Sequence, residues 1–96
     1  MAKHIMIRGH KYTVKHVDKF DDGSTIGRCS QRKAAIEILK GMPKSIDAET
    51  TIHEVLHAVC YHSGVYRDKR GMVGEEHMID AISNGLYQLG FKPPIK

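Results

Sequence analysis

The pentapeptide H-E-V-L-H at residues 53–57 constrains this chain of 96 residues more than any other feature. In an α-helix, His53 and His57 lie on one face about one turn apart, so both imidazoles can bind the same zinc ion. Glu54 then stands beside the metal, where its carboxylate can take a proton from a bound water. The pattern is that of a zinc hydrolase, and by itself it is only moderately specific in a chain with seven histidines.

The segment around the pentapeptide has the signals of a helix over about residues 48–63. Asp47 is a favourable N-cap, Glu49 lies in the first turn, where a carboxylate is stabilising, and Gly64 is a natural stop. Four apolar residues at helical spacing predict the buried stripe of this helix: Ile52, Val55, Leu56 and Val59.

A second helix is predicted over about residues 75–89, followed by Gly90 as its stop and by a short tail at 91–96. Gly85 in its middle costs about 1 kcal/mol relative to alanine, a cost that a close approach of the two helices would justify. The expected apolar face of this helix is formed by Ile79, Ile82, Leu86 and Leu89.

The first forty residues have the alternation and turn signals of β-strands. His4–Ile7 is a short apolar segment, and Lys11–Asp18 alternates with the period of a half-buried strand. Residues 21–24 form a strong turn signal, after which Thr25–Cys29 and Ala34–Leu39 are further strand candidates. We therefore expect one α+β domain over residues 1–96, with a small, mainly antiparallel sheet packed on two helices.

The second helix offers three neighbouring residues, Glu75, Glu76 and His77, as a third zinc ligand. A catalytic zinc uses three protein ligands and keeps one position open for water. Asp80 lies one turn after Glu76 on the same face, and its carboxylate can accept the outer N–H of a ligating histidine. Glu75 and His77 have no such partner one turn later. Glu76 is therefore the predicted ligand, with Glu75 and His77 as alternatives.

The two motifs together, H-E-V-L-H at 53–57 and E-H-M-I-D at 76–80, resemble those of the gluzincin zinc metallopeptidases. In that group, H-E-x-x-H is followed by E-x-x-x-D on a "glutamate helix". The small size is similar to that of the minigluzincins and related short phage proteins. The resemblance covers about residues 34–89 and depends on these two motifs.

The resemblance implies a zincin-like minidomain with His53, His57 and Glu76 as zinc ligands, Glu54 as general base and Asp80 as the partner of a ligating histidine. It also implies that Ala34–Leu39 is the edge strand that aligns an extended peptide above the metal. A peptidase further needs a donor for the tetrahedral oxyanion. The candidates are His62, His77, Tyr87 and Tyr66, of which we favour Tyr66 in the loop between the helices.

Composition indicates an ordinary water-soluble domain, without the features of a nucleic-acid-binding or membrane protein. The net charge of +4 comes from lysines and arginines scattered along the chain, which favours a solvated surface over a nucleic-acid site. No segment has the length of a membrane span or the pattern of a signal peptide. Cys29 and Cys60 are too few and too isolated for a disulfide framework, so we expect a reducing cytoplasm. The resemblance to short phage proteins implies that this is the cytoplasm of a bacterial or phage-infected cell.

The expected function is that of a zinc-dependent metallopeptidase acting on a protein or peptide, with Glu54 as general base and with weak or narrow activity. The alternative is a zinc-stabilised binding or regulatory module without peptidase activity, possible for a chain with no second domain to close a cleft. The substrate, the oligomeric state and the position of the tail at 91–96 relative to the cleft stay open at this level.

Overall fold

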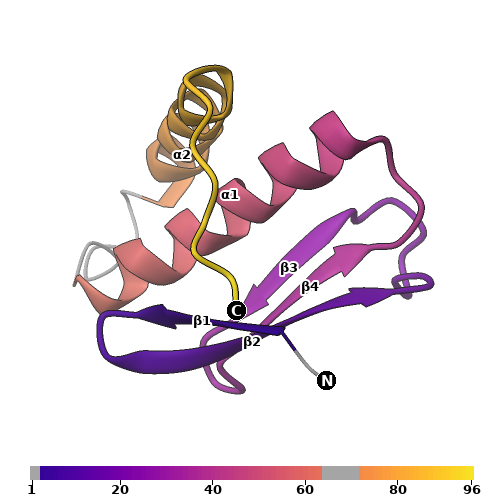
Figure 1. Ribbon diagram of the computed structural model, residues 1–96, viewed down its shortest axis with the longest axis horizontal. Helices are drawn as coiled ribbons and strands as arrows, with labels where there is room; N and C mark the ends of the chain where they lie inside the picture. The colour runs from indigo at the N-terminus through magenta and orange to yellow at the C-terminus, as the bar shows by residue number, and fades with distance from the viewer. Residues whose placement is uncertain (1–2, 64–71) are drawn as a thin grey trace.

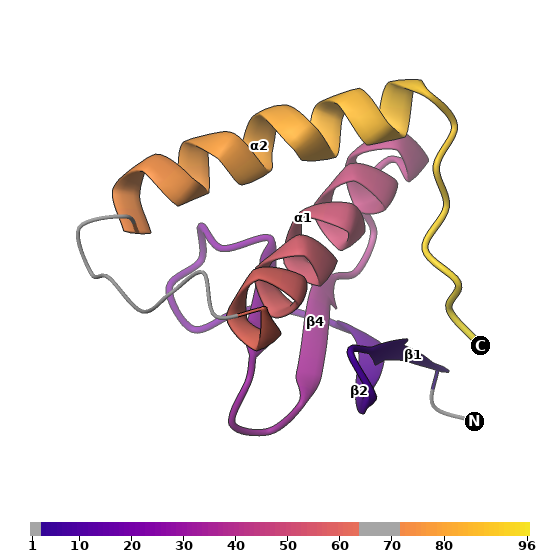
Figure 2. The ribbon, with the colours of Figure 1, turned by 90° about the vertical axis from the view of Figure 1, so that its left-hand side faces the viewer.

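The computed structural model describes residues 3–63 and 72–96, with only the backbone described for residues 72–75. In these residues four strands form one sheet, and two helices lie on one side of it (Figure 1). Helix α1 packs on the sheet and α2 crosses α1 on the side away from the sheet, as Figure 2 shows. The predicted α+β class is confirmed. No helix in this part of the chain is long and apolar enough to cross a bilayer.

The predicted strands and helices are present with shifted ends. Periodicity located them because side chains alternate between faces every two residues in a strand and recur every 3.6 residues in a helix. The elements are β1 (Lys3–Ile7), β2 (His10–Val17), β3 (Gly27–Ser30), β4 (Ala35–Leu39), α1 (Lys44–His62) and α2 (Met72–Gln88).

The sheet has the strand order β1-β2-β4-β3, with β2 and β4 parallel and the other two pairs antiparallel. The expectation that residues 34–39 form the edge strand is wrong, because β4 lies between β2 and β3. Ile36 and Ile38 agree with this central position, because both are fully buried. The helical layer covers them, and β2 and β3 flank them on either side. The edge strand on the side of β4 is β3.

The core lies between the sheet and α1. The inward-facing residues of the β1–β2 hairpin include Tyr12 and Val14, and they share one cluster with Val55 and Ala58 of α1. Each large apolar side chain buried in this way contributes about 1.5–3 kcal/mol relative to exposure. This core sets the orientation of α1. It therefore determines the direction in which the face with the histidines of the pentapeptide points.

Helix α1 begins earlier than predicted. Its first residue is Lys44, directly after Pro43, and the backbone N–H of Asp47 already donates to the carbonyl of Pro43 at 2.9 Å. The prediction of Asp47 as N-cap is therefore wrong. Its carboxylate instead contacts Nε2 of His16 at 2.7 Å and ties the first turn of α1 to β2. The helix ends at His62, and the predicted stop at Gly64 lies outside the described residues.

The predicted apolar face of α2 is partly wrong. Ile79 is buried, but Ile82 and Leu89 are 43% and 86% exposed, and the fully buried neighbour of Ile79 is Ser83. The hydroxyl of Ser83 donates to the carbonyl of Ile79 at 2.6 Å, so a small polar side chain can be buried where the helices cross. Helix α2 consequently faces α1 through the side that also carries Glu76.

Gly85 of α2 is not at a close helix contact, contrary to expectation: nothing described lies within 4 Å of a Cβ built there. Gly85→Ala is therefore expected to raise the free energy of unfolding by about 0.5–1 kcal/mol, measured by urea denaturation. Gly90→Ala is the opposite control, since Gly90 has a φ of +84° and ends the helix, with Phe91 N–H donating to Leu86 O at 3.0 Å. A loss of stability in Gly85→Ala would contradict this description of the helix face.

The C-terminal tail runs from α2 down to the far edge of the sheet (Figure 2). Lys96 and His4 exchange two backbone hydrogen bonds of 2.8 Å, and Ile95 packs against the core. The tail therefore pairs with β1 and leaves the edge of β3 clear of it.

Candidate metal centre

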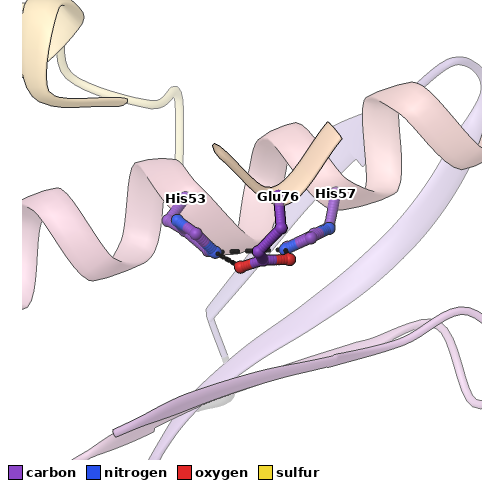
Figure 3. A group of neighbouring side chains, drawn as sticks. All are labelled: His53, His57 and Glu76. Atoms are coloured by element: carbon purple, nitrogen blue, oxygen red, sulfur yellow. Dashed lines mark hydrogen bonds and ion pairs between the residues drawn. The ribbon is translucent and has the colours of Figure 1, made fainter. Parts of the chain in front are cut away.

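Three side chains from two helices converge between α1 and α2 (Figure 3). Nε2 of His53 lies 2.8 Å from Oε1 of Glu76, and Nε2 of His57 lies 3.0 Å from Oε2 of the same carboxylate. The two imidazole Nε2 atoms are 3.1 Å apart. Tetrahedral zinc with bonds of about 2.0–2.1 Å holds its ligand atoms about 3.3 Å from each other. The spacing of these three groups is therefore close to that of a zinc site.

The acceptor atoms that face one another in this cluster also suit a bound cation. Oδ1 of Asp80 lies 2.9 Å from Nδ1 of His53, within hydrogen-bond distance, which favours the tautomer with its proton on Nδ1. In a neutral ring this leaves Nε2 of His53 as an acceptor facing Nε2 of His57 and the carboxylate of Glu76. Acceptors at these distances repel one another unless protons or a cation lie between them. Two imidazoles and one carboxylate are a donor set that suits zinc.

Glu54 is a buried carboxyl group beside this cluster. Its residue is only 8% exposed, and it lines the cavity next to His53 and Glu76. In the described part of the chain, its carboxylate makes no hydrogen bond or ion pair. Burial raises the pKa of Glu54 to about 7; the charge of His53 lowers it and the charge of Glu76 adds to the rise. Buried carboxyl groups with raised pKa values are characteristic of acid–base catalysts.

Gly27 allows β3 to pass directly against this part of α1. A Cβ at this position would lie 2.6 Å from Cγ2 of Thr50 and 3.1 Å from Oε2 of Glu54. The sequence analysis did not identify this contact. The available signal was a glycine inside a strand, which often marks the close approach of another segment. Gly27 therefore helps to place the carboxylate of Glu54.

Gly27→Ala is expected to lower the free energy of unfolding by about 1–3 kcal/mol, because the new methyl group overpacks the contact between β3 and α1. Urea denaturation measures the loss. Thr50→Ser removes Cγ2, so the double variant with Gly27→Ala should recover much of the stability. Full stability in Gly27→Ala alone would show that β3 does not pass this close to α1.

A cavity of about 420 Å³ opens beside the cluster, between β3, α1 and α2. Its wall includes all of the polar groups that the two motifs predicted, except His57: His53, Glu54, Glu76 and Asp80. From there the wall continues to the start of β3 and along α1 towards its first turn. The residues in this extension are Thr25, Ile26, Gly27, Ile46, Glu49 and Thr50.

The remaining candidate residues lie elsewhere. Nε2 of His62 and the hydroxyl of Tyr12 share a hydrogen bond of 2.6 Å, and the ring of His62 stacks on that of His10. His77 is exposed and Tyr87 is half-buried, and neither of them nor His62 lines the described wall of the cavity. Two predictions lie outside what the structure describes, namely Tyr66 as oxyanion donor and the side chain of Glu75 as alternative ligand.

Comparison of the chain with family models, with curated proteins and with solved structures finds no match. The resemblance to gluzincins therefore depends on the two sequence motifs. In the structure these motifs meet at one place, with H-E-x-x-H on α1 and E-x-x-x-D on α2.

Proposed function

We propose that this protein is a zinc-dependent peptidase of the gluzincin type. In this proposal His53, His57 and Glu76 hold the zinc ion, and Glu54 is the general base. The main support is the buried carboxyl group of Glu54, which makes no described polar contact and lies in a cavity wall beside three converging ligand atoms. A purely structural zinc site has no need of such a group, because burying an unpaired carboxyl costs free energy.

When bound, zinc lowers the pKa of a coordinated water and polarises the carbonyl of the scissile peptide bond. Glu54 accepts the proton of the attacking water and passes that proton to the leaving amine. Asp80 accepts the Nδ1–H of His53, which keeps Nε2 of that ring free to bind the metal.

The edge of β3 offers a way to hold an extended substrate. In the described part of the chain no strand pairs with the outer edge of β3, and the first residue of this strand, Gly27, lines the cavity. A peptide can add to such an edge as a further strand, with its backbone bound by hydrogen bonds and its side chains in pockets. The role that the resemblance assigned to residues 34–39 therefore passes, in this proposal, to β3.

The direct test is hydrolysis of unstructured peptides by the zinc-loaded protein. We expect slow cleavage that appears with zinc and disappears after chelation. Mass spectrometry of the products measures this cleavage. Stoichiometric zinc without any cleavage would instead leave the alternative, a zinc-stabilised binding or regulatory module. We assign the activity to the reducing cytoplasm of a bacterial or phage-infected cell, since two isolated cysteines, Cys29 and Cys60, do not make a disulfide framework.

A further inference from the structure

Among the described residues of the cavity wall, Glu49 is the one carboxylate without a role in the proposed chemistry. The wall contains four acidic residues, of which Glu76 binds metal, Glu54 is the base and Asp80 holds His53; its described residues include no lysine or arginine. Glu49 lies one helical turn before His53 on the same face of α1. Nδ2 of Asn84 donates to Oε1 of Glu49 at 3.2 Å, which holds the carboxylate near the crossing of the two helices.

Two isoleucines with large exposed areas lie in the same extension of the cavity. Ile26, just before β3, is 43% exposed, and Ile46, in the first turn of α1, is 44% exposed. Apolar walls beside a carboxylate suit a side chain with an aliphatic stem and a cationic end, because the stem leaves water while the charge is paired.

The charge of the helical layer favours the same ligand. Helix α1 contains three acidic residues and one lysine, Lys44, and α2 contains three acidic residues and neither lysine nor arginine. One divalent cation does not neutralise this excess of negative charge. A cationic group that enters the cavity is therefore attracted by the surrounding field.

We propose that this part of the cavity is a subsite for a lysine or arginine side chain of the substrate. Ile26 and Ile46 pack on the stem, and Glu49 binds the cationic end. The inference rests on the proposed function, in which a peptide lies along β3. Glu49 is about 6 Å from His53 along the axis of α1, comparable with the roughly 6.6 Å between alternate side chains of a strand. The selected residue is therefore one or two positions from the scissile bond.

N-acetylated peptide hydroxamates, which bind zinc through the hydroxamate, test the subsite without requiring turnover. Calorimetry on the zinc-loaded protein would compare compounds with lysine, arginine, norleucine and glutamate side chains. Norleucine keeps the aliphatic stem and lacks the charge. We expect the lysine compound to bind about tenfold or more tightly than the norleucine compound, because a charge-assisted contact is added.

In Glu49→Gln this ratio should fall towards one, since the amide can still accept from Asn84 but carries no charge. Glu37→Gln is the matched control. It removes the same charge from β4, where Glu37 pairs with Arg28 at 3.1 Å and does not line the cavity, and it should keep the preference.

Equal binding of the lysine, norleucine and glutamate compounds would overturn the subsite, as would a lysine preference that survives Glu49→Gln, or no binding at all. A norleucine compound with a free α-amine that equals the lysine compound would also overturn it, by assigning the charge to a peptide N-terminus. Peptide hydrolysis, measured separately, distinguishes the two proposals. Lysine preference without hydrolysis keeps the subsite and rejects the peptidase, and hydrolysis without preference does the reverse.

Discussion

Glu54→Gln is expected to lower kcat/KM for peptide hydrolysis by about 10²- to 10⁴-fold while zinc stays bound, the usual range for loss of a general base. Glutamine keeps the size of the side chain and loses its basicity. Glu54 is not one of the three groups that converge on the metal position, so the zinc content should not change. Initial rates with a fluorogenic peptide and metal analysis of the same sample measure both effects.

Glu37→Gln is the control for this experiment, because it removes an equivalent charge from the sheet, away from the cavity. Its rate should match that of the unchanged protein. Hydrolysis that persists undiminished in Glu54→Gln would reject Glu54 as the base and leave the cause of its burial unexplained.

Removal of zinc is expected to have the largest effect on stability. The three proposed ligands come from α1 and α2, so a bound ion adds a link between the two helices of a small domain of 96 residues. Free zinc at 1,000 times its Kd adds about 4.1 kcal/mol. For a domain of this size that corresponds to a rise in Tm of about 15–30 °C.

Thermal unfolding followed by circular dichroism, with zinc and with a chelator, measures this rise. His57→Ala removes one ligand, so its Tm should no longer depend on zinc. Equal Tm values for the zinc-loaded and metal-free protein would contradict a metal bridge between the helices.

Local features of the fold could be predicted from the sequence, and the pairing of distant segments could not. Alternation identified β2, and helical spacing identified α1, because both signals depend on neighbouring residues. The central position of β4 depends on which strands cover Ile36 and Ile38, and local periodicity does not contain this information. Asp47 had the chemistry of an N-cap, but its carboxylate contacts His16 of a distant strand.

In the candidate metal centre, too, the local features could be predicted from the sequence and the distant contacts could not. His53 and His57 share one helix, so their spacing alone predicted that they face one way. Glu76 was preferred because Asp80 follows it by one turn, and the structure places both beside His53. The extension of the cavity to Glu49 was not anticipated, since it requires the start of β3 to lie against the first turns of α1.

Zinc affinity in Glu76→Gln tests the central claim most directly. Competition with a chromophoric chelator would give stoichiometry and Kd for the unchanged protein, for this variant and for the Glu37→Gln control. We predict one zinc ion per chain in the unchanged protein and the control, and binding weakened by at least about 100-fold in Glu76→Gln, because a ligand is lost. Zinc bound with unchanged stoichiometry and affinity in Glu76→Gln would contradict the site formed by His53, His57 and Glu76.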